Sequence, residues 1–270
     1  MLVFAHVPKT GGTSITAILL RFLTACGVPA ENVLLYGTLI PYTDLAPLEQ
    51  LPGSIRFLAG HFRVQHYEQL LPHQPFVLAS SRKPFERFCS AIEHFERVRR
   101  DGVRNLVDFE RTSALMAGLE RCRGSRQGIC EVLLRYQQAP ESNRGLRRIL
   151  LHQNRFVADA RIESTEIEQL CEMLATQTPK TVIDFATLKG VSHQNVWPRI
   201  FFNRFTSSEH DLLRECFEES FRDTIELMQD FHAQVPSLFT PDRWERFCQQ
   251  LCPPDTAALP KILASQCLSQ

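Results

Sequence analysis

The sequence lacks an excess of charge of either sign. Its 270 residues include 30 lysines and arginines and 30 aspartates and glutamates, so the formal net charge is zero. No overall field would attract a nucleic acid or an anionic membrane, and an anionic ligand would have to be bound by a local cluster. We therefore expect no nucleic-acid partner.

Long hydrophobic runs are also missing. No apolar run approaches the length that spans a bilayer, and the N-terminus does not show the layout of a signal peptide. The first predicted strand begins at residue 2, which leaves no room for a targeting segment before it. The sequence therefore predicts a protein without a transmembrane segment and with a cytoplasmic location.

The nine cysteines do not form a metal-binding or disulfide framework. They are scattered and odd in number, and without a secretory signal this favours reduced thiols. Cys248 and Cys252 lie one helical turn apart, but no second Cys/His pair at zinc-finger spacing accompanies them. We predict no metal site. Internal repeats and low-complexity segments are absent as well.

What the sequence does contain is a glycine-rich turn near its N-terminus. Residues 2–14 are Leu-Val-Phe-Ala-His-Val-Pro-Lys-Thr-Gly-Gly-Thr-Ser, and apolar residues at helical spacing follow. A strand, a glycine loop and a helix together present backbone N–H groups and a helix N-terminus to an anion. Glycines allow close approach, hydroxyls add donors and lysine adds a positive charge. The predicted phosphate- or sulfate-binding residues are Lys9, Thr10, Gly11, Gly12, Thr13 and Ser14.

This turn differs from a Walker A loop. In that motif the lysine and a magnesium-binding hydroxyl follow the last glycine, whereas Lys9 precedes the glycine pair here. A P-loop-type kinase or hydrolase is therefore an alternative interpretation, but the sequence does not contain the magnesium ligand that such an enzyme needs. In a second alternative, the glycines only end a strand and the Thr-Ser pair only caps a helix.

A second strand–loop–helix pattern begins at residue 76. A short apolar run over 76–79 is followed by Arg82-Lys-Pro-Phe-Glu-Arg-Phe-Cys-Ser90. Pro84 suits the first position of a helix, and an apolar stripe at helical spacing follows it. Arg82 is thus predicted at the carboxyl end of a strand, where open α/β sheets bind ligands, and Ser90 lies off the stripe. In the alternative interpretation, Arg82 is a surface charge and Ser90 a neutral helix residue.

The rest of the chain shows weaker patterns. Residues 31–54 indicate an irregular connection containing a short apolar run, and 180–206 a long loop. Further extended segments are predicted at 55–59, 155–158 and 161–162, and helices at 106–120, 129–138, 164–178, 208–233 and 244–251. Arginines are dense between residues 97 and 148, with acidic residues among them. They form either a solvated helical face or a surface for an anionic acceptor.

The two motifs together resemble the two signatures of sulfotransferases that depend on 3′-phosphoadenosine 5′-phosphosulfate (PAPS). The resemblance is carried by Pro-Lys-Thr-Gly-Gly-Thr-Ser at 8–14 and by the segment from Arg82 to Ser90, each between a strand and a helix. The chain is most similar to the carbohydrate-type group, which includes the heparan sulfate 2-O-sulfotransferases and bacterial relatives. The similarity is clear over residues 1–25 and 55–96 and looser elsewhere.

The resemblance implies an α/β, P-loop-like three-layer fold in which helices flank a central parallel sheet, with helix-rich insertions and a helical C-terminal part. It implies a single sulfotransferase domain over residues 1–270. The cofactor motifs would lie in 1–96, an acceptor-side helical region at 97–150 and C-terminal helices at 208–270.

The resemblance also assigns roles to residues. Lys9 and its turn would hold the 5′-phosphosulfate, and Arg82 and Ser90 would hold the 3′-phosphate. The chemistry agrees, because a guanidinium fork binds a terminal phosphate bidentately while a lysine suits a point of developing charge. The family places a catalytic histidine in a Gly-His segment between the two motifs, and His61 matches it. Its ordinary pKa suits a general base.

Other residues stay open as weaker candidates. His66, Glu93 and His94 are reserve bases, and His193 and Asn195 would close over the nucleotide. The enzyme predicted in this way transfers a sulfuryl group from PAPS to an acceptor hydroxyl, with a carbohydrate favoured. The chain lacks the membrane anchor and stem of the Golgi members, which favours a soluble, bacterial-type enzyme over one acting on glycosaminoglycans. A further alternative is an inactive nucleotide-binding module.

Overall fold

The computed structural model describes residues 1–36, 48–62, 68–102, 109–138, 158–177, 183–193 and 199–251. The chain forms two compact units, each made from separated segments. The first, here called the sheet unit, contains Met1–Ser81, Phe156–Val196 and Val235–Gln270. The second, here called the helical unit, contains Arg82–Arg155 and Trp197–Gln234. The units therefore interleave along the chain.

The sheet unit is built on five parallel strands. They are β1 (Leu2–Ala5), β2 (Val33–Tyr36), β3 (Phe57–Gly60), β4 (Phe76–Ser81) and β5 (Ala160–Glu163). Their order is β2-β3-β1-β4-β5, and Ala5 at the end of β1 pairs with Gly60 and Ala79. The short apolar run that we placed within an irregular connection is the edge strand β2. Because all strands run the same way, their carboxyl ends meet at one edge.

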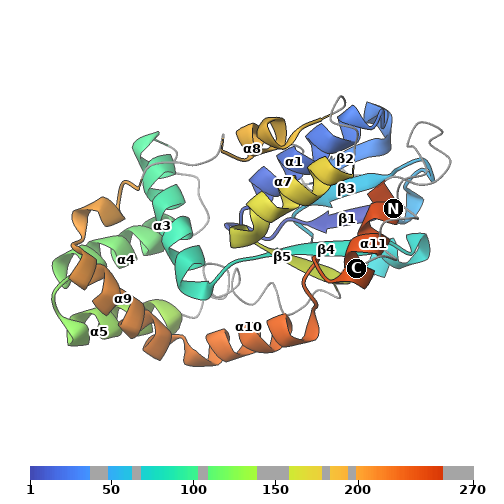
Figure 1. Cartoon of the computed structure of the whole chain (residues 1–270). Helices are drawn as coiled ribbons and strands as arrows, with labels where there is room; N and C mark the ends of the chain where they lie inside the picture. The colour runs from blue at the N-terminus through green and yellow to red at the C-terminus, as the bar shows by residue number, and fades with distance from the viewer. Residues whose placement is uncertain are drawn as a thin grey trace. The chain divides into compact units, whose positions relative to one another are not determined.

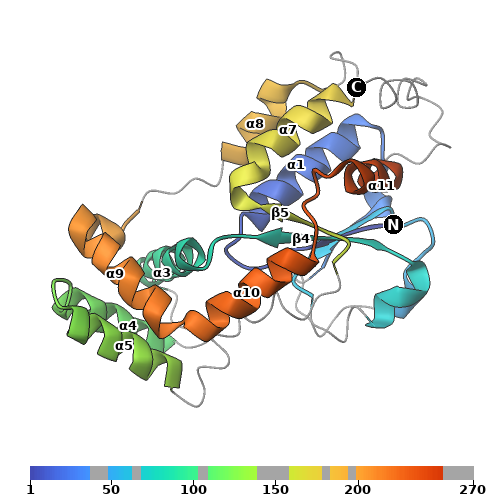
Figure 2. The same cartoon turned by 60° about the horizontal axis from the view of Figure 1, so that its bottom comes forward.

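In the described part of the sheet unit, the helices that cover the sheet are α1 (Gly12–Ala25), α7 (Ile167–Thr176), α8 (Phe185–His193) and α11 (Pro241–Leu251). Helices α1, α7 and α8 lie side by side (Figures 1 and 2). The prediction of a loop over 180–206 is wrong for α8. Its start is marked by Asp184, whose carboxylate accepts the N–H of Thr187 at 2.8 Å, a capping signal that we did not use. The prediction of an α/β fold with helices around a parallel sheet is confirmed.

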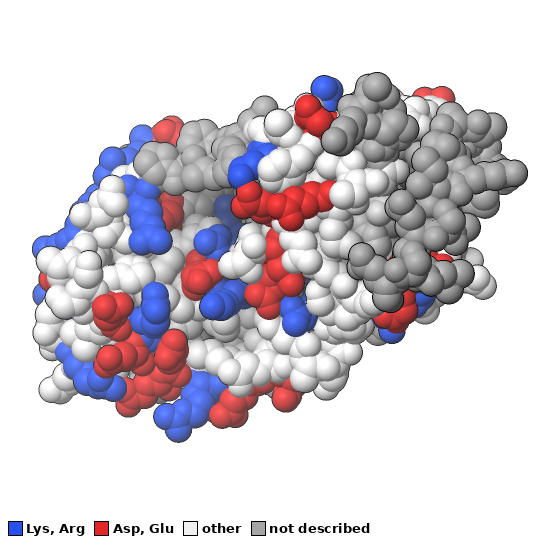
Figure 3. Space-filling view, viewed as in Figure 1, with Lys and Arg blue, Asp and Glu red and all other residues white. Residues whose placement is uncertain are grey.

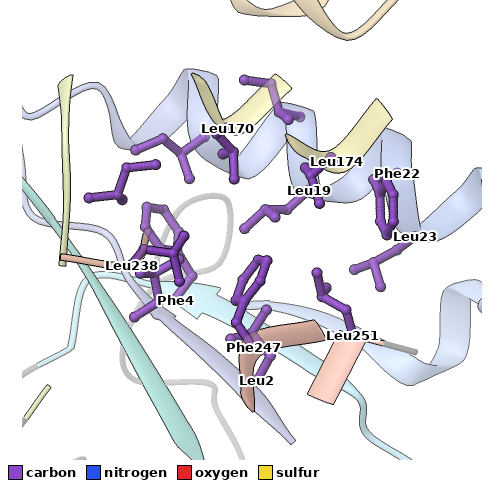
Figure 4. Close-up of a cluster of buried hydrophobic side chains, with 14 of the residues drawn as sticks. Leu2, Phe4, Leu19, Phe22, Leu23, Leu170, Leu174, Leu238, Phe247 and Leu251 are labelled. Carbon is purple, nitrogen blue, oxygen red and sulfur yellow. The ribbon is translucent and has the colours of Figure 1, made fainter. Parts of the chain in front are cut away.

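One face of the sheet forms a continuous apolar core with these helices (Figure 4). Leu2 and Phe4 are fully buried, as are Leu19 of α1, Leu170 of α7 and Phe247 of α11. Val3 and Ala5, which alternate with Leu2 and Phe4 in β1, are buried too, as expected for a central strand of a parallel sheet that is covered on both faces. This core fixes the strand ends that carry the loops described below.

The described residues of the helical unit include α3 (Pro84–Arg100), α4 (Phe109–Arg121), α5 (Arg126–Gln138), α9 (Ser207–Ser220) and α10 (Arg222–Gln234). Proline occupies the first turn of α3, and the predicted stripe of Phe85, Phe88, Ile92 and Phe95 is buried. The prediction of a single helix over 208–233 is wrong, because the chain breaks at Phe221 into α9 and α10 (Figure 2). Thr206 caps α9 in a reciprocal pair with Glu209.

Several arginines of the predicted Arg-rich region are paired with acidic side chains. Arg126 contacts Glu215 at 2.8 Å and Glu219 at 3.0 Å, and Arg135 lies 3.7 Å from Glu131. Figure 3 accordingly shows basic and acidic groups next to each other on the visible face of the helical unit. At these positions the structure favours the solvated helical face over an acceptor-binding surface.

Glu96 is the most buried carboxylate of this charge network. Its side chain is 0% exposed, and its oxygens lie 2.8 Å from Arg99, 3.0 Å from Arg100 and 2.8 Å from Arg204. Burial opposes ionisation, but the hydrogen bonds and charges of these arginines outweigh it and hold the pKa of Glu96 below its ordinary value of 4.5. The carboxylate therefore joins α3 to the segment that precedes α9.

We expect Glu96→Gln to destabilise the protein by about 1–3 kcal/mol at neutral pH, because three charge-assisted hydrogen bonds are weakened. A group with a lowered folded-state pKa stabilises fully above its ordinary pKa and loses that effect as pH falls through the folded value. The difference between wild type and variant, measured by urea denaturation, should shrink below pH 4.5. Glu131→Gln, which removes an exposed ion pair, is the control and should change stability by less than about 0.5 kcal/mol. An equal effect of both substitutions at every pH would contradict this account.

Candidate functional site

The loop between β1 and α1 has the backbone geometry of an anion-binding turn. Lys9 adopts a left-handed conformation with φ 67°, which is uncommon for a residue other than glycine, and Gly11 has φ 83°. Helix α1 begins at Gly12, and among the described residues no side chain caps its first turn. The first N–H groups of the helix and its dipole thus point toward the loop, where they favour negative charge.

A closed set of hydrogen bonds holds this loop to the end of β4. The Thr10 hydroxyl lies 2.6 Å from the carbonyl of Val7 and 2.6 Å from the Ser80 hydroxyl, and the N–H of Val7 lies 3.3 Å from the same Ser80 oxygen. A carbonyl only accepts, so Thr10 donates to Val7, Ser80 donates to Thr10, and the Val7 N–H donates to Ser80. The Thr10 side chain therefore shapes the loop from inside, and only its backbone N–H could serve a ligand.

His6 and Gly12 fit together tightly. A Cβ placed on Gly12 would lie 1.9 Å from Cδ2 of the His6 ring. Gly12 does not have a positive φ, so glycine is required here by space rather than by backbone conformation. The His6 ring also lies 4.4 Å from the ring of His61, centroid to centroid. It thus fills the space between the start of α1 and the predicted base.

His61 follows β3 at the same edge of the sheet. Its Nδ1 lies 2.7 Å from the main-chain carbonyl of His6, and because that carbonyl only accepts, Nδ1 carries the hydrogen. Burial, with a smaller contribution from Lys9, outweighs this bond and lowers the pKa of His61 below 6.5. The neutral imidazole therefore holds its proton on Nδ1, and Nε2 is the nitrogen that can accept one.

Lys9 acts electrostatically on both histidines. Its ammonium contributes to the lowered pKa of His61 and to that of His6, which burial first of all, and then His61, bring to about 3. Lys9, the glycine turn and His61 all belong to the sheet unit. Of the two hydroxyl residues in the first turn of α1, Thr13 is exposed and Ser14 is buried.

The other two predicted cofactor residues belong to the helical unit. Arg82 directly follows β4 and forms an ion pair with Glu86, Nε to Oε2, at 3.7 Å, with 31% of its side chain exposed. Ser90 is partly exposed on α3. Arg82 lies between β4 and α3, and Ser90 lies two turns into α3, as the sequence predicted for each residue.

The structure describes some of the reserve candidates and not others. His66 and Asn195 lie outside the described residues, and His193 is the last residue of α8. The carboxylate of Glu93 accepts three backbone N–H groups, from Ile200 at 2.6 Å, Phe201 at 3.1 Å and Phe202 at 2.9 Å. It serves to fix the segment before α9, which leaves it poorly suited to proton transfer.

Sequence reasoning missed three neighbours of the loop: His6, Ser80 and Ser164. A Cβ on Gly11 would lie 3.5 Å from Cβ of Ser164, so the turn after β5 forms a wall of the loop. Ser80 was detectable as a hydroxyl at the end of a buried strand. His6 could have been found from the pairing of β1 with β3, which makes it the neighbour of His61.

Comparisons with protein families, curated proteins and solved structures found no match to this chain. In the described parts of the chain, no helix combines the length and the apolar character needed to cross a membrane. The functional interpretation therefore depends on the residues of the site themselves.

Proposed function

We propose that this protein is a PAPS-dependent sulfotransferase with a P-loop-like fold that transfers a sulfuryl group to an acceptor hydroxyl, with a carbohydrate as the favoured acceptor. The observation that carries the proposal is the juxtaposition, in the sheet unit, of an uncapped helix start, Lys9 and a neutral His61 whose tautomer leaves Nε2 able to accept a proton. A turn that only caps a helix would need neither the positively charged side chain nor the base.

The loop suits a phosphosulfate in chemical terms. The N–H groups of the first turn of α1 and the ammonium of Lys9 supply positive charge where two adjacent oxyanion groups would lie. Gly11 and Gly12 allow the close approach that backbone donors require. We further propose that Arg82 and Ser90 bind the 3′-phosphate, which ATP lacks, and that the enzyme acts in the cytoplasm.

PAPS, when bound, supplies the sulfuryl group: the acceptor oxygen bonds to sulfur while the bond from sulfur to the 5′-phosphate oxygen breaks, and that oxygen keeps the electron pair. Nε2 of His61 takes the proton of the acceptor hydroxyl. Lys9 and the N–H groups of the loop stabilise the negative charge that builds on the leaving oxygen. By analogy with phosphoryl transfer, the reaction requires attacking and leaving oxygens in line, which the loop and His61 would enforce from two strand ends.

The first test is a thermal-shift measurement with adenosine 3′,5′-bisphosphate, 5′-ADP and ATP with magnesium. A ligand that binds only the folded state stabilises it by about 2.7 kcal/mol at a concentration one hundred times its dissociation constant. We expect selective stabilisation by the 3′-phosphorylated nucleotide, and loss of that selectivity in Arg82→Ala. As a control, Arg135→Ala changes a mostly exposed arginine of α5 and should leave the selectivity for the 3′-phosphorylated nucleotide intact.

The other outcomes distinguish the alternatives. Equal or stronger stabilisation by magnesium-ATP would replace the proposal with a kinase or hydrolase. Selective binding of adenosine 3′,5′-bisphosphate without transfer from PAPS to any of a broad panel of carbohydrates and other hydroxyl compounds would favour an inactive binding module. Failure of every nucleotide to raise the melting temperature would contradict the cofactor assignment.

A further inference from the structure

The His6 side chain has no role in the proposed reaction so far, although it contacts both halves of the site. It follows β1 directly, and its N–H donates to the carbonyl of Gly60 at 2.9 Å, so the pairing of β1 with β3 continues through it. This pairing sets the main chain of His6 beside that of His61. The carbonyl of His6 can then accept the Nδ1–H of His61.

The ring of His6 is confined on two sides. On one side, the ring lies so close to Gly12 that a single added carbon there would overlap it. On the other, it packs against His61 with an interplanar angle of 35°. The third neighbour is Phe4, whose ring lies 6.2 Å away and nearly parallel at 18°. A ring held in this way limits the rotation of the imidazole that it touches.

We propose that His6 is a positioning residue of this site: its ring is a spacer between the first residue of α1 and His61, and holds the His61 imidazole in the Nδ1–H orientation that directs Nε2 toward the acceptor. The expected effect of His6 on catalysis rests on the proposed function. Its effect on the orientation of the His61 imidazole does not, because that orientation is a property of the free protein. His6 itself transfers no proton in this role.

The neutral state of His6 suits a spacer. Burial, with the nearby His61 and Lys9, lowers its pKa to about 3, so the ring carries no charge at neutral pH. A charged imidazolium at this position would face Lys9 and would repel a protonated His61. The same neutrality predicts that an uncharged ring of similar size can take its place.

The test combines spectroscopy with kinetics on three proteins: wild type, His6→Ala and His6→Phe. NMR spectra that correlate imidazole nitrogens with carbon-bound ring protons report which nitrogen of His61 is protonated. We expect a single Nδ1–H tautomer in the wild type and a mixture in His6→Ala, where the ring can rotate away from the carbonyl. We expect kcat to fall about 10- to 100-fold in His6→Ala, because small misplacements of a reacting group are costly.

His6→Phe separates a spacer from a chemical role and guards against misfolding of the alanine variant. It should retain the Nδ1–H tautomer and most of kcat. A His6→Phe variant as impaired as His6→Ala, or a His6→Ala variant with an unchanged His61 tautomer, would overturn the proposal. If wild type shows the tautomer and His6→Ala loses it, but no PAPS-dependent transfer is found, the positioning role stands and the proposed function fails.

Discussion

Replacement of His61 by alanine should lower the rate of sulfuryl transfer about 10²- to 10⁴-fold, the usual contribution of a positioned general base. The same variant should bind adenosine 3′,5′-bisphosphate with nearly unchanged affinity, because His61 faces the acceptor rather than the nucleotide in the proposed reaction. Transfer of labelled sulfate from PAPS measures the first effect, and the thermal shift measures the second.

The pH dependence adds an independent check on this residue. Only the neutral imidazole accepts a proton, so kcat/KM should decline as pH falls through the pKa of His61 in the free enzyme. Since burial holds that pKa below 6.5, the decline should occur on the acid side of the ordinary histidine value. His73→Ala, which changes a histidine in the turn before β4, should leave both rate and profile intact. Full activity in His61→Ala would show that another group is the base.

Gly12→Ala should have the second large effect, because the added methyl carbon has no room. It would lie 1.9 Å from the His6 ring, so the ring or the first turn of α1 must move. Overpacking of this kind destabilises by about 1–3 kcal/mol. We expect the free energy of unfolding measured by urea denaturation to fall by that amount. Stabilisation by adenosine 3′,5′-bisphosphate should also be lost, since the displaced turn carries the N–H groups that we propose bind the anion.

Two further variants show whether the effect is local. Gly190→Ala introduces the same methyl group into α8 in open space, where it should be neutral or stabilising by up to about 1 kcal/mol. The double variant Gly12→Ala/His6→Ala removes the ring that the methyl group would meet, so it should be more stable than the sum of the single effects predicts. Simple additivity of the two substitutions would show that Gly12 is needed for a reason other than His6.

Local structure around the candidate site could be predicted from the sequence where it depends on consecutive residues. The Lys9 turn, the strand before it and the helix after it follow from local signals, because proline, glycine and apolar spacing act over a few residues. Likewise, Pro84 and the phenylalanines after it predicted the start and the buried face of α3, and the structure confirms both.

Features that depend on contacts between distant residues could not be predicted in this way. The Thr10 hydroxyl is held by Ser80, which lies 70 residues away in the sequence. Glycine is required at position 12 because the His6 ring occupies the space of a Cβ, and not because a turn needs its backbone freedom. Strand β2 is only four residues long, and its pairing with β3 outweighs the turn signals around it. The break at Phe221 lies within a continuous helical pattern and has no glycine or proline to mark it.

The interleaving of the two units determines when during synthesis either unit can be completed. Strand β4 lies between β1 and β5, yet β5 is separated from it by the first segment of the helical unit, and α11 covers the core only at residues 241–251. At typical translation rates of about 5–20 residues per second, roughly 4–16 s pass between the appearance of β4 and that of β5, which pairs with it. One side of a hydrophobic parallel strand stays open during that time, and pairing across such sequence distances is intrinsically slow. Neither unit can therefore be produced by cutting the chain at a single point, because each is made from separated segments.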